Sequence, residues 1–302
     1  MRIAQSLRGA TLLVALADVA RAQGSAPPAA FTTSASVSAQ HQFEANLDGG
    51  GSVKSDRLAI SMGASRRFVP AFTAGLSLGY EVQEWRFQGL VPSTPGAPWG
   101  TVLRPSLGLS LGLALSPRFV TGVGPFLEWS YAREAGTEAA LTGGATLSAF
   151  GIFSPRFTFG GGAKLQRQLF STKLTPFVIV NWQLAPKLRL ANASSTGPLG
   201  SGGVEIRYAP RADCEFAAGG VYRSTRFRLD ARGASEGDVG EAGGIPILAR
   251  ASYLHRTGVR ADLQAGAQMK GKLERRDPDG KELAKVDVAT APTVSLTLSD
   301  RW

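Results

Sequence analysis

From residue 34 onward, apolar side chains alternate with small or polar ones along most of the chain. In residues 259–270, for example, Val259 and Leu263 occupy one set of alternate positions, whereas Asp262 and Gln264 occupy the other. Successive side chains of a β-strand point to opposite faces, so this period of two predicts a sheet with one apolar and one polar face. An amphipathic helix would place apolar residues three and four apart, which these segments do not do.

The connections between the expected strands alternate in length. Short turns containing Pro or Gly are expected at residues 68–71, 116–118, 154–156, 185–187, 209–212 and 255–258. Longer polar connections are expected at residues 45–55, 88–100, 132–141, 170–172, 192–201, 230–244 and 271–282. Together they predict about 14 antiparallel strands in sequence order, or 12 if the ambiguous segment 175–191 does not form two strands.

This alternation of turns and loops favours an all-β membrane protein. Strands of roughly ten residues, with short turns at one end and longer loops at the other, are typical of bacterial outer-membrane barrels. Because lipid cannot hydrogen-bond to backbone groups, a membrane sheet must close on itself. A soluble β-sandwich is the alternative, but it rarely keeps short and long connections in turn. We therefore predict that residues 34–302 form one closed antiparallel transmembrane β-barrel, an up-and-down meander with its apolar face toward lipid.

Both ends of the chain fit export to a bacterial outer membrane. Residues 1–22 have a basic start, a short apolar stretch and small residues before the cut, as in a secretory signal peptide cleaved after Ala22. Residues 23–33 are expected to be a flexible lead-in. The last expected strand ends on the aromatic Trp302, which resembles the assembly signal that such barrels present to their insertion machinery.

Aromatic residues gather toward the ends of the expected strands. In membrane barrels such positions form girdles at the lipid headgroups, although ordinary strand enrichment in aromatic residues is the alternative. The girdle is expected to contain Phe68, Phe72, Trp85, Trp129, Tyr131, Phe157, Tyr253 and Trp302.

Composition narrows the function classes. With one Cys and two His in 302 residues, a disulfide framework is excluded, no metal or other cofactor is expected, and Cys214 is interpreted as a small hydrophobe near a strand start. The 33 Lys and Arg exceed the 23 Asp and Glu, but they are spread along strands and loops, so no nucleic-acid partner is expected. Outer-membrane lipid is the expected partner, with anionic lipopolysaccharide near Arg226, Arg228, Arg232, Lys270, Lys272, Arg275 and Arg276.

The polar strand faces should line the barrel interior. One interpretation is a set of cross-strand ion pairs that stiffen the wall, each worth up to about 1 kcal/mol. The other is a water-filled pore with a mild anion preference, because rings of Arg and Lys favour anions. Both can hold together. The lumen-lining candidates are Arg57, Glu81, Glu128, Lys164, Glu205, Arg207, Glu215, Arg223, Arg250, Arg260, Asp262 and Lys270.

No set of residues predicts catalysis. His41 is expected toward the long loops and His255 at a tight turn, so the two cannot share a site, and neither has an evident Ser partner. Glu44 and Asp48 are the acids close to His41 in sequence, too few for a protease site. Residues 277–282 lack the ligand spacing of a calcium loop and are expected to form a solvated turn.

The last third of the chain carries a family resemblance. The segments RSTRFRLD at 223–230, GIPI at 244–247, GKL at 271–273 and DGKEL at 279–283 resemble a family of outer-membrane β-barrel proteins of unknown function. The resemblance implies the same location and fold, and it carries no catalytic, cofactor or binding residue.

Three functions are considered for such a barrel. The first is a porin-like passive pore for small polar or anionic solutes. The second is a non-conducting structural or adhesive barrel that acts through its extracellular loops. An envelope-lipid-modifying enzyme is the third and the least supported, and we expect the protein not to be an enzyme.

Overall fold

The computed structural model describes residues 31–89, 99–193, 202–229 and 237–302. The signal peptide and most of the lead-in expected from the sequence lie outside these ranges. The described segments are almost entirely strands, with one short 3-10 helix at Glu138–Ala140. The strands are β1 (Phe31–Asn46), β2 (Ser52–Val69), β3 (Phe72–Gln88), β4 (Thr101–Ser116), β5 (Phe119–Trp129), β6 (Tyr131–Ala132), β7 (Leu141–Ser154), β8 (Phe157–Gln168), β9 (Ser171–Ala185), β10 (Leu188–Asn192), β11 (Val204–Arg211), β12 (Cys214–Gly220), β13 (Arg223–Arg228), β14 (Val239–Leu254), β15 (Arg260–Arg276), β16 (Glu282–Val288) and β17 (Ala291–Arg301).

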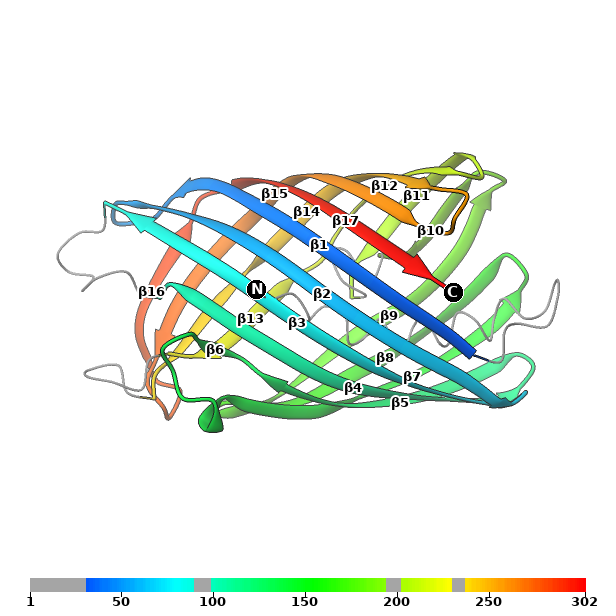
Figure 1. Cartoon of the computed structure of the whole chain (residues 1–302), viewed down its shortest axis with the longest axis horizontal. Helices are drawn as coiled ribbons and strands as arrows, with labels where there is room; N and C mark the ends of the chain where they lie inside the picture. The colour runs from blue at the N-terminus through cyan, green and yellow to red at the C-terminus, as the bar shows by residue number, and fades with distance from the viewer. Residues whose placement is uncertain (1–30, 90–98, 194–201, 230–236) are drawn as a thin grey trace.

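The sheet closes on itself because β1 pairs antiparallel with both β2 and β17 (Figure 1). Three positions in the wall are shared by consecutive segments: β5 and β6 both pair with β4, β12 and β13 with β14, and β16 and β17 with β15. The 17 segments therefore make a 14-strand barrel, which confirms the predicted fold class and strand number. The ambiguous segment 175–191 does supply two of these strands, β9 and β10.

The connections separate the barrel into a turn end and a loop end. The start of β1 and the C-terminal residue lie at the turn end, where the Thr33 amide donates a 2.7 Å hydrogen bond to the Trp302 carbonyl. The sequence placed a longer connection at 170–172, and this is wrong: Ser171 and Thr172 belong to β9, which leaves a two-residue turn after β8. The barrel also begins three residues earlier than expected, at Phe31.

The outward face carries an apolar band of membrane dimensions. On β2 the outward residues between Asp56 and Arg66 are apolar, and Leu58, Ile60 and Met62 are among the exposed large hydrophobic side chains. Ten residue steps span about 33 Å along the strand, which is about 25 Å along the barrel axis at a tilt of about 40°. This matches the roughly 25 Å apolar band of outer-membrane barrels. In the described part of the chain, no helix combines the length and apolar character needed to cross a bilayer.

At the loop end, β13 leaves the wall and crosses to the opposite side. The Arg228 amide of β13 donates a 2.9 Å hydrogen bond to the Ser130 carbonyl, and the same residue pairs in parallel with Tyr131 of β6. The strands from β13 through β17 and β1 to β6 thus enclose a narrower ring. Its interior is filled by a loop-end cluster of buried residues: Ala45, Leu47, Val53, Trp99, Val102, Phe227, Leu229, Leu273, Val288 and Ala291.

The displacement of β13 interrupts the wall beside β9. Strand β10 covers only the stretch of β9 from Asn181 onward, and the Asn192 side chain extends the ladder by binding the Val178 carbonyl (2.7 Å) and the Val180 amide (2.8 Å). Beyond this point, residues 171–177 of β9 have ladder partners only on β8 in the described part of the chain. We call this interruption the side gap. Pro176 lies on it at a position whose N–H would face the gap, which suits an edge strand.

Candidate functional site

The interior contains two groups of charged side chains, and the larger one is centred on Arg250. The Arg250 guanidinium, almost fully buried, lies 2.8 Å from the Glu205 carboxylate, 3.0 Å from Glu215 and 3.4 Å from Asp262. Arg260 binds two of the same acids, at 3.0 Å from Glu215 and 2.8 Å from Asp262. At the margin of this group, Arg207 lies 3.2 Å from Glu205, and Arg189 lies 3.6 Å from Glu215. This Arg250 network ties β10, β11, β12, β14 and β15 together.

The second group, which we call the arginine cluster, contains Arg57, Arg104 and Arg223 around Glu81. The Glu81 carboxylate is fully buried, with Arg57 Nη2 3.3 Å from one oxygen and Arg104 Nη1 bound to the other. Arg104 was missed in the sequence. It stands among the leucines of β4, but it shares its face with Ser106, which marks the inward side and could have revealed it.

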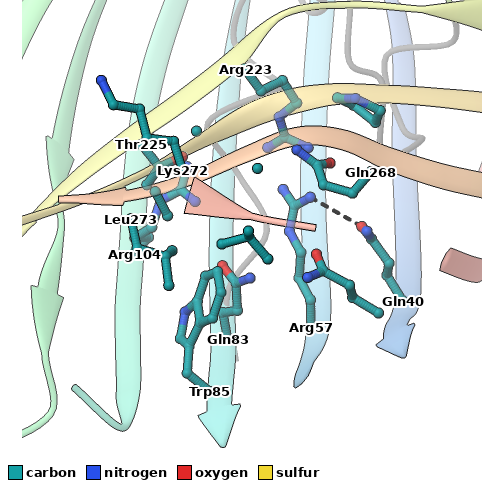
Figure 2. Close-up of a pocket in the computed structure, with 16 residues that line it drawn as sticks. Gln40, Arg57, Gln83, Trp85, Arg104, Arg223, Thr225, Gln268, Lys272 and Leu273 are labelled. Atoms are coloured by element: carbon teal, nitrogen blue, oxygen red, sulfur yellow. Dashed lines mark hydrogen bonds between the residues drawn. The ribbon is translucent and has the colours of Figure 1, made fainter. Parts of the chain in front are cut away.

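The arginine cluster borders a cavity of about 80 Å³ beneath the loop-end cluster (Figure 2). Figure 2 shows the guanidinium groups of Arg57 and Arg223 pointing toward each other from opposite walls, with Gln268 beside them. The Nε atom of Arg57, and Nε and Nη2 of Arg104, are buried without a hydrogen-bond partner among the described residues. The cavity is lined by Gln40, Gln42, Arg57, Gln83, Trp85, Arg104, Arg223, Thr225, Ala242, Gly243, Pro246, Gln268, Gly271, Lys272, Leu273 and Val288.

The remaining lumen candidates are Glu128, Lys164 and Lys270. Glu128 is fully buried on the inward face of β5, and the Lys164 ammonium lies 4.6 Å from the centre of the Phe126 ring. Lys270 departs from the prediction: it is exposed and has a positive φ of 48°. It lies at a bulge opposite Gly244, where the alternation of β15 shifts, and Lys272 lines the cavity in its place.

A third part of the interior is apolar. Val120, Phe150 and Ile179, on β5, β7 and β9, form a buried cluster with Phe177 packed against it, and Gly160 of β8 lies between Phe150 and Ile179. Phe177 belongs to the stretch of β9 that borders the side gap. The lumen therefore has a charged side, built from β1–β4 and β10–β15, and an apolar side next to the gap.

The aromatic residues expected in the girdle lie toward both ends of the barrel. At the turn end, Phe68 packs on Phe72 with ring centres 5.8 Å apart, Phe153 packs on Phe157 at 5.6 Å, and Trp302 is exposed. Tyr253 is likewise exposed near this end, whereas Trp129 and Tyr131 are half-buried on the outward face toward the loop end.

Trp85 does not belong to the girdle. It shares the inward face of β3 with Glu81, packs between Phe87 and Trp99, and lines the cavity, so its assignment from position near a strand end is corrected.

The two histidines lie on different strands or turns and have different partners. His41 points outward and its Nδ1 lies 2.6 Å from Asp56, an acid that the sequence interpretation did not pair with it; Arg86 lies 3.1 Å from the same carboxylate. His255 is exposed in a turn and bonds to Thr257 at 2.9 Å. In the ranges that the structure describes, no three His, Cys, Asp or Glu side chains are grouped to hold a metal ion.

Most of the cations expected near lipopolysaccharide have partners within the protein. Arg226 lies 2.6 Å from Glu241 and Arg275 lies 2.6 Å from Asp238, while Lys272 and Arg276 both bind Glu274. Arg228 binds backbone carbonyls, Lys270 is exposed, and Arg232 lies outside the described residues.

Comparison with known proteins identifies the architecture. No protein-family model and no curated protein sequence matches the chain, so the family resemblance stays a prediction. Its fold is similar to a COG4313 outer membrane channel from Pseudomonas putida F1, with a TM-score of 0.50 and 9% identity over 93% of this chain and 98% of that chain. The Pseudomonas putida toluene transporter TodX follows with a TM-score of 0.46 and 9% identity, covering 90% of each chain. The KdgM porin has a TM-score of 0.35 and 12% identity, over 88% and 98%. Because the sequence identities are this low, the similarity to the COG4313 channel shows only the outer-membrane barrel fold.

Proposed function

We propose that the protein is a passive channel for small polar or anionic solutes in a bacterial outer membrane. The observation that carries the proposal is the contrast between the two faces of the wall. The outward face presents an apolar band of membrane height, whereas the inward face holds ionised side chains and a cavity lined by three arginines. Charged groups at membrane depth are costly unless they are paired or wetted, and they commonly mark solute pathways.

Export and insertion are part of the same proposal. We infer that residues 1–22 direct the chain across the inner membrane and that cleavage follows Ala22. The exposed Trp302 at the end of β17 then presents the final strand to the insertion machinery. Outer-membrane lipid surrounds the apolar band, and the exposed Lys270 is available to anionic lipopolysaccharide.

The loop-end cluster favours a second candidate, a non-conducting barrel that acts through its loops. Its members are at most 8% exposed, so this end of the ring is packed like a soluble core. We propose the side gap, which adjoins the apolar side of the interior, as an alternative exit that avoids the cluster. The channel proposal therefore predicts a narrow conductance rather than that of a wide porin.

Planar-bilayer recording of the refolded full chain tests the proposal. We expect discrete current steps, and a reversal potential in a salt gradient that has the sign of anion preference because basic groups outnumber acids in the arginine cluster. The absence of steps at any salt or voltage would instead establish the non-conducting barrel. A catalytic role is not part of the proposal, and the envelope-lipid mass spectrum should be unchanged by overexpression.

A further inference from the structure

We propose that the cavity beside the arginine cluster is a binding site for the carboxylate of a small organic anion. The proposal deepens the channel function, on which it rests, by assigning a solute class and a site to it.

The first argument is charge. Three guanidinium groups, from Arg57, Arg104 and Arg223, face two carboxylates, since Glu81 binds Arg57 and Arg104 and the buried Glu128 also interacts electrostatically with Arg104. Lys272 at the margin is already bound to Glu274. The cavity wall therefore has a net positive charge. Because Arg57 and Arg223 point toward each other across the cavity (Figure 2), an anion between them would replace a repulsion by two attractions.

The second argument is that hydrogen-bond donors of two buried arginines lack partners. Arg104 is 2% exposed and uses Nη1 on Glu81, while its Nε and Nη2 have no partner among the described residues. Arg57 is 7% exposed, and its Nε is likewise unpartnered. A buried charged donor without an acceptor is costly, and the planar guanidinium fork matches the two oxygens of a carboxylate.

The third argument decides between an organic and an inorganic anion. The cavity is also lined by the indole of Trp85 and the aliphatic side chains of Leu273 and Val288, which give it an apolar part suited to the body of an organic anion. The amides of Gln83 and Gln268 can bind one further polar group. About 80 Å³ compares with the roughly 10–15 Å³ that one water needs, so the ligand is small. A carboxylate on a compact apolar body fits these walls.

Binding is measured on the full chain in uncharged detergent, by isothermal titration calorimetry at pH 7 in low-chloride buffer. The probes are benzoate, its neutral analogue benzyl alcohol, and inorganic phosphate. Benzoate should bind saturably at one site, and both other probes should bind about tenfold more weakly or not at all. Arg104→Gln and Gln268→Glu should each weaken benzoate by about tenfold or more, since each removes or opposes a charge-assisted hydrogen bond. The matched control is Arg189→Gln, which removes an inward arginine of the Arg250 network and should change the affinity by no more than about twofold.

The two variants guard against misfolding, because Gln268→Glu leaves the Arg104–Glu81 pair intact. Absence of saturable benzoate binding to the wild type would overturn the proposal. So would phosphate binding as tightly as benzoate, or Arg189→Gln weakening benzoate as much as Arg104→Gln does. Because the measurement needs no ion flow, its failure leaves the bilayer result standing, and a silent bilayer leaves the binding result standing.

Discussion

The loop-end cluster should act as the constriction of the channel, and Phe227→Ala tests this directly. Phe227 is 1% exposed, and its ring meets that of Trp99 edge-on with centres 5.1 Å apart. The neighbouring strand β14 cannot fill the space that the ring leaves. Its residue beside the ring is Gly240, which has no side chain, and a Cβ added there would lie 2.4 Å from the Phe227 ring. Removing a buried Phe costs about 3–5 kcal/mol, and part of that comes from a cavity that remains. We expect lower stability together with a wider path.

The assays are urea unfolding in detergent for stability and single-channel recording for the path. Phe227→Ala should lower the unfolding free energy by about 3–5 kcal/mol and raise the single-channel conductance. Phe216→Ala, on the outward face of β12, is the matched control: it removes an exposed ring from the lipid side and should leave the conductance unchanged. If folded Phe227→Ala conducts like the wild type, the cluster is not the constriction, and ions leave through the side gap.

Three further results are expected. Asn192→Ala removes two hydrogen bonds from the edge of β9, about 1–3 kcal/mol in sum, and mass-detected hydrogen exchange should show faster exchange in β9 while β8 stays protected. Arg250→Gln removes the nearest partner of buried Glu205 and one of the two arginines on Asp262, and should cost about 3–5 kcal/mol in urea unfolding, whereas Arg211→Gln, at an exposed turn pair, should leave the unfolding free energy nearly unchanged. Deleting Trp302 should slow assembly in cells, seen as a smaller folded fraction by heat-modifiable gel mobility, without shifting the stability of protein refolded in detergent.

Alternation was enough to predict the wall of the barrel, because each strand has lipid on one side and the lumen on the other. The two misplaced residues show where this reasoning stops. Trp85 was assigned to the girdle from its place near a strand end. It lies an even number of residues from Glu81 on β3, so both side chains point into the barrel. Lys270 was assigned from the alternation of side chains, but it lies within the bulge opposite Gly244, where that alternation changes. Inward and outward side chains alternate regularly between bulges, but the sequence does not show clearly where a bulge occurs.

The loop end could not be predicted from local pattern. The segment RSTRFR alternates like any other wall strand, and nothing in it indicates that Arg228 pairs with Tyr131 across the lumen. The inward apolar residues Val53, Val102 and Leu273 look like exceptions to a polar lumen when each strand is taken alone. They form a core only because β13 crosses the lumen and packs against them. This contact joins segments that are far apart in the sequence.

This crossing also sets the energy scale for opening the barrel. On its way over the lumen β13 is held by a backbone bond to Ser130 and by two guanidinium groups. Arg226 binds Gln168 and Ser171 on the β8–β9 hairpin at 2.9 Å each, and Arg228 donates to the Ala139 carbonyl at 3.3 Å. Individual hydrogen bonds of this kind contribute about 0.5–3 kcal/mol. The apolar contacts of Phe227 are larger, at about 3–5 kcal/mol by the substitution estimate. Three or more such bonds together contribute an amount comparable to the ring contact, so packing and polar attachments both hold β13 in its crossing position. Replacing the ring contact alone should loosen the loop end without dismantling the wall.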